Sequence, residues 1–163
     1  MRIAVIADTH MPRGRRALSP ECLDRLRRAE LILHAGDLTG LSFLDWLREV
    51  GPPVAAVFGN ADEPEVRRAL PGQQVIDLAG IRIGMVHIPG PKVGRGERLI
   101  RLFPGCEAII YGHTHAPSAE RLDGVWLLNP GSPTERRRSP TRTMLELVVS
   151  GSLLTPRLIE LDS

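Results

Sequence analysis

The sequence predicts an α/β fold in which two β-sheets face each other and helices cover their outer sides. In the first 70 residues, short apolar runs alternate with segments of helical period, which is typical of strands and helices that build a mainly parallel sheet. From residue 73 on, apolar runs follow one another across tight turns. The second half is therefore expected to be rich in β-strands.

Three apolar runs in the first half are expected to be buried strands, and they span residues 2–7, 31–37 and 53–60. A helix is expected to begin at Ser19, because a serine cap is followed by Pro20 at the first position and Glu21 in the first turn. The spacing of apolar residues, together with the turns that follow them, predicts helices at residues 19–29, 41–50 and 63–70.

The second half is expected to contain three hairpins, at residues 73–88, 121–132 and 143–161. The Asp123-Gly124 pair is a strong turn signal for the second of them. One more helix is expected at residues 94–103 and one more buried strand at 107–112. The chain has no linker, repeat or low-complexity tract, so residues 1–163 are expected to form a single domain.

The composition is ordinary for a soluble globular protein, with 42% hydrophobic and 25% charged residues. No apolar run approaches the ~18 residues of a membrane span, and the first apolar run is too short for a signal peptide. We therefore expect a cytoplasmic protein with no membrane partner. A net charge of +2 with 4% aromatic residues gives little support to nucleic-acid binding beyond short nucleotides.

Scarce polar residues stand where five apolar runs end. These are Asp8 with His10, Asp37, Asn60, His87, and His113 with His115. Because the carboxyl ends of strands in α/β sheets converge on one crevice, these side chains are expected to lie close together. The remaining histidine, His34, lies inside the second run and is expected to be a hydrogen-bonded core residue.

This mixture of side chains is suited to a pair of metal ions. Two divalent cations ~3.5–4 Å apart need a shared anionic ligand, and they bind a water as hydroxide near neutral pH. Asp37, alone at its strand end, is the natural bridge. Imidazole, carboxylate and amide ligands together suit Mn²⁺, Fe²⁺ or Zn²⁺ better than Ca²⁺.

These motifs in this order resemble those of the calcineurin-like metallophosphoesterases: D-x-H, GD, GN, a lone His and GHTH over residues 8–115. The NPGS segment at residues 129–132 is similar to that of the small YfcE-type phosphodiesterase branch, which also contains the retromer scaffold subunit. The resemblance implies a metallo-dependent phosphatase-like fold, a four-layer α/β/β/α sandwich of two mixed sheets flanked by helices. It also implies a small phosphoester as substrate, and a homodimer is a family-level expectation.

The resemblance also implies roles for individual residues. The first metal would be held by Asp8, His10 and His115, with Asp37 bridging, and the second by Asn60, His87 and His113. The implied reaction is in-line attack of a metal-bound hydroxide on phosphorus, with Asp37, Asn60 and His87 as catalytic residues. Asn60 is also expected to contact the phosphate. Manganese is the expected metal, with zinc, iron and nickel as alternatives.

The chain departs from the family pattern after the GN asparagine, where many relatives carry histidine and this sequence has Ala61. Alanine cannot donate a proton, and general acid catalysis is typically worth ~10²–10⁴-fold. We therefore expect a preference for phosphodiesters with stable leaving groups, such as aryl esters. Arg13, Arg15 and Arg16 are candidates for binding the substrate phosphate, and Arg13 is the first choice among them. The alternative is that all three are exposed loop charges. The Arg136–Arg138 run is expected to be a solvated loop.

Two alternatives to a phosphodiesterase remain open. One is a non-catalytic protein-binding scaffold of the same fold, although a scaffold has no need of four histidines at strand ends. The other is a phosphomonoesterase or nucleotide hydrolase, against which Ala61 counts.

Overall fold

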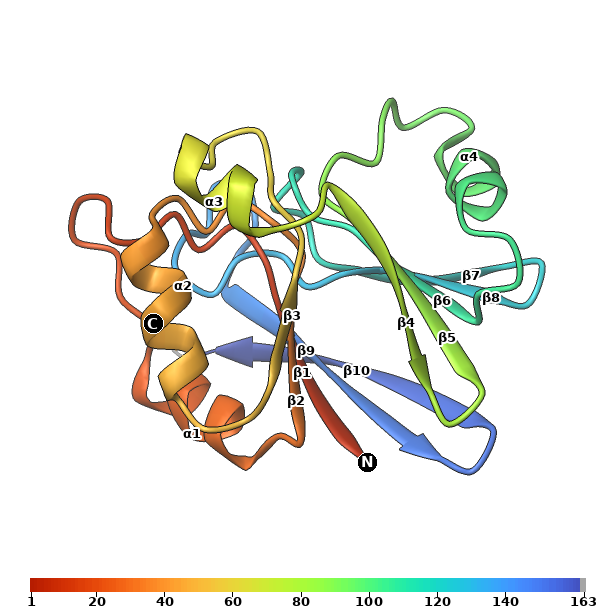
Figure 1. The fold of residues 1–163 in the computed structure, drawn as a ribbon. Helices are drawn as coiled ribbons and strands as arrows, with labels where there is room; N and C mark the ends of the chain where they lie inside the picture. The colour runs from red at the N-terminus through yellow and green to blue at the C-terminus, as the bar shows by residue number, and fades with distance from the viewer. Residues whose placement is uncertain (162–163) are drawn as a thin grey trace.

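The computed structural model describes residues 1–161 and contains two five-stranded sheets that face each other (Figure 1). The first sheet has the order β10-β9-β1-β2-β3. Its strands are β1 (Arg2–Ile6), β2 (Leu31–His34), β3 (Val54–Ala56), β9 (Arg142–Ser150) and β10 (Leu153–Leu161). Strands β1, β2 and β3 are parallel, and β9 is antiparallel to both of its neighbours. The parallel arrangement predicted for the first half is confirmed.

The second sheet has the order β4-β5-β6-β8-β7. Its strands are β4 (Gln73–Leu78), β5 (Ile81–Val86), β6 (Ala108–Ile110), β7 (Ser118–Leu122) and β8 (Val125–Asn129). The turn between β7 and β8 is at Asp123 and Gly124, both with positive φ, as the sequence predicts. Strand β7 begins three residues before the predicted hairpin, because Ser118 pairs with Asn129 although the start of this strand is polar and largely exposed.

Helices cover the outer sides of both sheets (Figure 1). They are α1 (Pro20–Arg28), α2 (Leu41–Glu49), α3 (Pro64–Ala69) and α4 (Arg95–Leu102). The predicted cap of α1 is confirmed, since Ser19 Oγ accepts a hydrogen bond from the Cys22 N–H at 3.2 Å. Helices α1, α2 and α3 pack with the first sheet, whereas α4 packs against the second.

Alternation along the strands divides the core into three layers. On β1, Ile3 and Val5 point between the two sheets, whereas Ala4 and Ile6 point toward the helices. On β6, Ile109 points outward to the cluster under α4. Each fully buried aliphatic side chain contributes about 1.5–3 kcal/mol relative to exposure. Three apolar layers between four structural layers confirm the predicted α/β/β/α sandwich.

Strand β3 is shorter than predicted, and this difference shapes the site. It ends at Ala56; the Val57 N–H still donates to the His34 carbonyl of β2 at 3.1 Å, whereas the Phe58 N–H donates to the Pro71 carbonyl at 3.0 Å, outside the sheet. Residues 57–60 therefore form a loop at the sheet edge instead of the end of a strand. Within residues 1–161, no helix is both long and apolar enough to cross a membrane.

Candidate metal centre

Backbone hydrogen bonds bring together the segments that follow the strands. The Asp8 N–H donates to the Gly36 carbonyl at 2.9 Å, and the His10 N–H donates to the Asp37 carbonyl at 3.0 Å. The His113 N–H, more than 100 residues away in sequence, donates to Asp8 Oδ2 at 3.0 Å. The predicted convergence of strand ends is therefore present between β1, β2 and β6.

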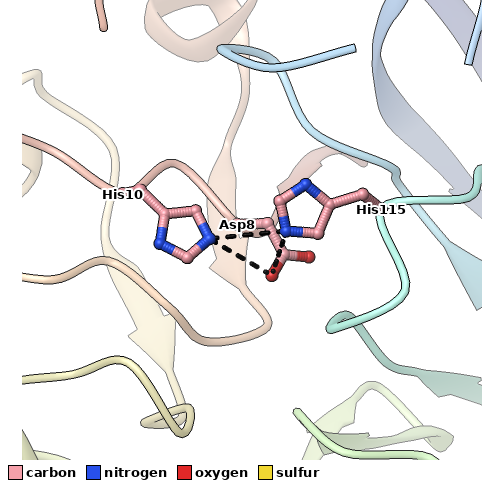
Figure 2. Close-up of side chains that lie close together, drawn as sticks. All are labelled: Asp8, His10 and His115. Atoms are coloured by element: carbon pink, nitrogen blue, oxygen red, sulfur yellow. Dashed lines mark hydrogen bonds and ion pairs between the residues drawn. The ribbon is translucent and has the colours of Figure 1, made fainter. Parts of the chain in front are cut away.

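Asp8, His10 and His115 form one compact group with ligand atoms within 4.8 Å of one another. Figure 2 shows the carboxylate of Asp8 directed toward the space between the two rings. His115 Nε2 lies 3.2 Å from Asp8 Oδ1 and 3.4 Å from His10 Nε2. All three residues are buried, and Asp8 Oδ1 has no hydrogen-bond partner among the described residues.

Asp37, His87 and His113 form the second group, again with ligand atoms within 4.8 Å. Asn60 completes it, because its Oδ1 lies 2.9 Å from His113 Nδ1 and 3.2 Å from His87 Nε2. His87 Nδ1 donates to the Ala35 carbonyl at 2.7 Å. This bond leaves Nε2 of His87 free to face the site, an arrangement common in metal-ligating histidines.

Asp37 lies between the two groups. Its Oδ2 is 3.1 Å from His87 Nε2 and 3.7 Å from His10 Nε2, while Oδ1 accepts the Ala61 N–H at 2.8 Å. Burial opposes ionisation of Asp37, but the hydrogen bond and charge of His87 outweigh burial and lower the pKa of Asp37 to about 2. Asp37 is therefore an anion that lies close to histidines of both groups.

The histidines of the site differ in how their surroundings affect protonation. Burial lowers the pKa of His10 and of His113, which favours the neutral imidazole that binds metals. Burial also opposes protonation of His87, but the hydrogen bond to Asp37 and the charge of Asp8 outweigh it and raise the pKa of His87.

The turns that carry the candidate ligands have an unusual backbone. Five of the predicted ligands are non-glycine residues with φ between 47° and 72°: Asp8, His10, Asp37, His113 and His115. Such conformations are costly for residues with a Cβ and cluster at functional sites. The fold therefore holds these side chains in place at a cost in backbone strain.

Asp62 supports the site and was not predicted from the sequence. Its buried carboxylate accepts the N–H groups of Thr39 and Gly59, each at 2.6 Å, and of Asp37 at 3.0 Å. Burial raises the pKa of Asp62 despite these three bonds. All three donors are main-chain groups, so no pattern of side chains predicts that Asp62 anchors these loops. The one signal in the sequence was the position of Asp62 just after the Gly-Asn turn.

The NPGS segment fixes the turns that carry ligands. Asn129 Nδ2 donates to Thr114 Oγ1 at 2.9 Å and to the Gly112 carbonyl at 3.3 Å. The Ser132 hydroxyl donates to the Asp8 carbonyl at 2.8 Å. The end of β8 and the segment after it therefore connect the turns that follow β1 and β6.

His34 lies behind the site as a core residue, as predicted. Its Nδ1 accepts the Gly36 N–H at 3.2 Å, so Nε2 carries the proton and donates to Thr9 Oγ1 at 3.0 Å. Burial lowers the pKa of His34 to about 3, which keeps the ring neutral.

A cavity of about 310 Å³ opens onto both ligand groups. Asn60 and Ala61 line it, and so do three arginines, Arg13, Arg16 and Arg137. Arg136–Arg138 are exposed, as expected of a solvated loop, yet the middle arginine of this run reaches the cavity.

The donor set fits divalent cations of borderline softness, because imidazole nitrogens, carboxylates and an amide oxygen lie close together, and Asp8 Oδ1 has no hydrogen-bond partner within residues 1–161. Two facing sheets flanked by helices, with these groups at strand ends, define the metallophosphoesterase class. The family model for the calcineurin-like phosphoesterase superfamily domain matches residues 1–152, and the chain belongs to this superfamily.

Known relatives agree with this assignment. A "probable metallophosphoesterase" of Methanothermobacter thermautotrophicus is 36% identical over 163 residues, covering 98% of this chain and 92% of that protein. Among solved structures, vacuolar protein sorting 29 of Cryptosporidium parvum shares the fold with a TM-score of 0.85 at 21% identity, covering 99% and 91% of the two chains. Wild-type Vps29 of Entamoeba histolytica complexed with Zn²⁺ has a TM-score of 0.78 at 27% identity, covering 98% and 99%.

Proposed function

We propose that the protein is a metal-dependent phosphodiesterase that works with two divalent cations. The observation that carries the proposal is the position of Asp37 Oδ2 between two groups of ligand atoms, 3.1 Å from His87 Nε2 and 3.7 Å from His10 Nε2. When bound, such a metal pair offsets charge on phosphoryl oxygens and activates a water nucleophile near neutral pH.

The surrounding residues of the chain would orient the ligands and the substrate. The bond from His87 Nδ1 to the Ala35 carbonyl fixes the ring with Nε2 toward the site. Asn60 Oδ1 faces His87 and His113, so its amide NH₂ group is left to donate to a phosphoryl oxygen. Asn60 would therefore serve both as a ligand and as a substrate-binding residue.

The preference for diesters with stable leaving groups rests on Ala61. This residue lines the cavity beside Asn60, and its N–H is already donated to Asp37. Its methyl side chain cannot protonate a departing oxygen, so esters of weakly acidic alcohols would lose the benefit of general acid catalysis. Aryl diesters do not depend on that proton.

Manganese remains our expected metal, because mixed nitrogen and oxygen ligands suit it. The Zn²⁺ complex of Vps29 from E. histolytica supports zinc as an alternative for this set of ligands. Iron and nickel also fit imidazole and carboxylate donors.

The test is a substrate panel on apo-protein reloaded with Mn²⁺, Zn²⁺ or Mg²⁺. It compares bis(4-nitrophenyl) phosphate, 4-nitrophenyl phosphate, alkyl diesters and cyclic nucleotides. We expect the aryl diester to turn over fastest and Asp37→Ala to abolish turnover, whereas Asp77→Ala, at an exposed carboxylate on β4, serves as the matched control. Equal turnover of aryl and alkyl diesters would contradict the role given to Ala61.

A protein-binding scaffold is the second candidate, and the Vps29 fold match is the observation that favours it. The two proposals differ in what metal loading does. If the protein binds metal at both groups but hydrolyses no ester in the panel, the scaffold is favoured. Faster turnover of 4-nitrophenyl phosphate than of the diester would instead indicate a phosphomonoesterase.

A further inference from the structure

The lining of the cavity over the metal centre combines two kinds of side chain. Candidate metal ligands such as His115 line it, and so do three arginines, Arg13, Arg16 and Arg137. The two sets meet at Glu135, whose Oε2 lies 3.6 Å from His115 Nδ1. The arginines come from the loop after β1 and from the segment after β8, so residues far apart in the sequence line one cavity.

Glu135 holds two of these arginines in place. Arg16 contacts Glu135 Oε1 through both Nε and Nη2, and Arg137 Nε lies 3.4 Å from Glu135 Oε2. Arg16 Nη1 also donates to the Arg13 carbonyl at 3.2 Å. Two guanidinium groups at the cavity are therefore organised without any ligand.

The charges of the three arginines are only partly offset. Arg13, Arg16 and Arg137 carry three positive charges and Glu135 carries one negative charge, which leaves two positive units at the cavity. A phosphodiester has one negative charge, and in the proposed reaction that charge lies at the metal ligands. Glu135 takes Nε and Nη2 of Arg16 and lies near Nε of Arg137, so the remaining guanidinium N–H groups of the three arginines are the donors for a different anionic group, such as a phosphate.

We propose that Arg13, Arg16 and Arg137 form an anion subsite that receives a second phosphate group of a phosphodiester substrate. This inference rests on the proposed function, because it takes the metal centre as the place of the bond that is cleaved. The substrate class is a phosphodiester that carries an additional terminal phosphate, as in a 3′-phosphorylated nucleoside 5′-ester. Glu135 is a positioning residue for Arg16 and Arg137.

The experiment uses two esters with the same leaving group: thymidine 5′-(4-nitrophenyl phosphate) with and without a 3′-phosphate. We expect the full-length metal-loaded protein to have a higher kcat/KM for the 3′-phosphorylated ester. Arg16→Gln and Arg137→Gln should each lower the ratio of the two kcat/KM values about tenfold, since hydrogen bonds between charged groups are strong. Arg15→Gln and Arg138→Gln, at exposed arginines of the same loops that do not line the cavity, should leave the ratio unchanged.

A binding measurement separates the subsite from the catalytic proposal. Calorimetry compares thymidine 3′,5′-bisphosphate with thymidine 5′-monophosphate on metal-loaded and on metal-free protein. We expect tighter binding of the bisphosphate, an advantage that falls with added salt and is lost in Arg16→Gln. If neither ester is hydrolysed but this advantage is present, the phosphodiesterase proposal fails and the subsite stands. Equal binding of the two nucleotides, or a ratio of kcat/KM values that is the same in the wild type and in all variants, would contradict the subsite.

Discussion

The contacts of Asp62 predict a large loss of stability when its carboxylate is removed. In Asp62→Ala, the N–H groups of Asp37, Thr39 and Gly59 lose their acceptor inside the protein. Hydrogen bonds to a charged acceptor are worth about 1.5 kcal/mol or more each, so three bonds total about 4.5 kcal/mol. Relief of the buried charge offsets part of this, and we expect a decrease of about 3 kcal/mol in the free energy of unfolding.

Urea denaturation of the metal-free proteins measures this decrease. Asp62→Asn keeps one acceptor oxygen for Asp37 and Gly59 but places an amide NH₂ against the Thr39 N–H, so about half of the loss is expected. Glu65→Ala is the control, because Glu65 is exposed and its ion pair with Arg68 is worth at most about 1 kcal/mol. Metal affinity of Asp62→Ala should also fall, by about 10–100-fold. If Asp62→Ala is no less stable than Glu65→Ala, the reasoning about main-chain anchoring is refuted.

Three further predictions concern Asp37 and the residues around it. A Cβ at Gly59 would lie 2.2 Å from Asp37 Oδ1, so Gly59→Ala should displace that carboxylate and weaken metal binding in calorimetric titrations; wild-type affinity in this variant would show that the loop has room to move. In the metal-free protein, the pKa of Asp37 is lowered to about 2, against 3.8 in the unfolded chain. This shift adds about 2 kcal/mol to the free energy of unfolding above pH 4, and the contribution is lost as the pH falls toward 2. The raised pKa of His87 adds stability that is present below pH 6.5 and lost as the pH rises through its folded value. Urea denaturation midpoints measured from pH 2 to 8 test both directions of change. If Asp37→Asn loses stability with falling pH as steeply as the wild type, the prediction for Asp37 is contradicted.

Much of the fold was predictable because alternation and turn chemistry are local signals. The cap at Ser19 and the turn at Asp123-Gly124 depend on neighbouring residues, and both are confirmed. The start of β7 was missed because its polar residues form a strand only through pairing with β8. The end of β3 was missed because the Phe58 N–H bonds to the Pro71 carbonyl, a partner in a later loop that the apolar run itself does not indicate.

The site was predictable to a similar degree and for a related reason. Ligands at the ends of parallel strands converge wherever the sheet forms, so residues such as Asp8 and His115 could be grouped without distances. Asp62 could not, because it acts through main-chain donors. Glu135 could not either, because its partner Arg16 is 119 residues away in the chain. Contacts of this kind depend on how the loops pack.

The most direct test of the central claim is anomalous diffraction from crystals of the manganese-loaded protein. We expect two peaks about 3.5–4 Å apart. One ion should contact Asp8, His10 and His115, the other should contact Asn60, His87 and His113, and one oxygen of Asp37 should be shared between them. A single ion, or ions bound away from these residues, would contradict the account.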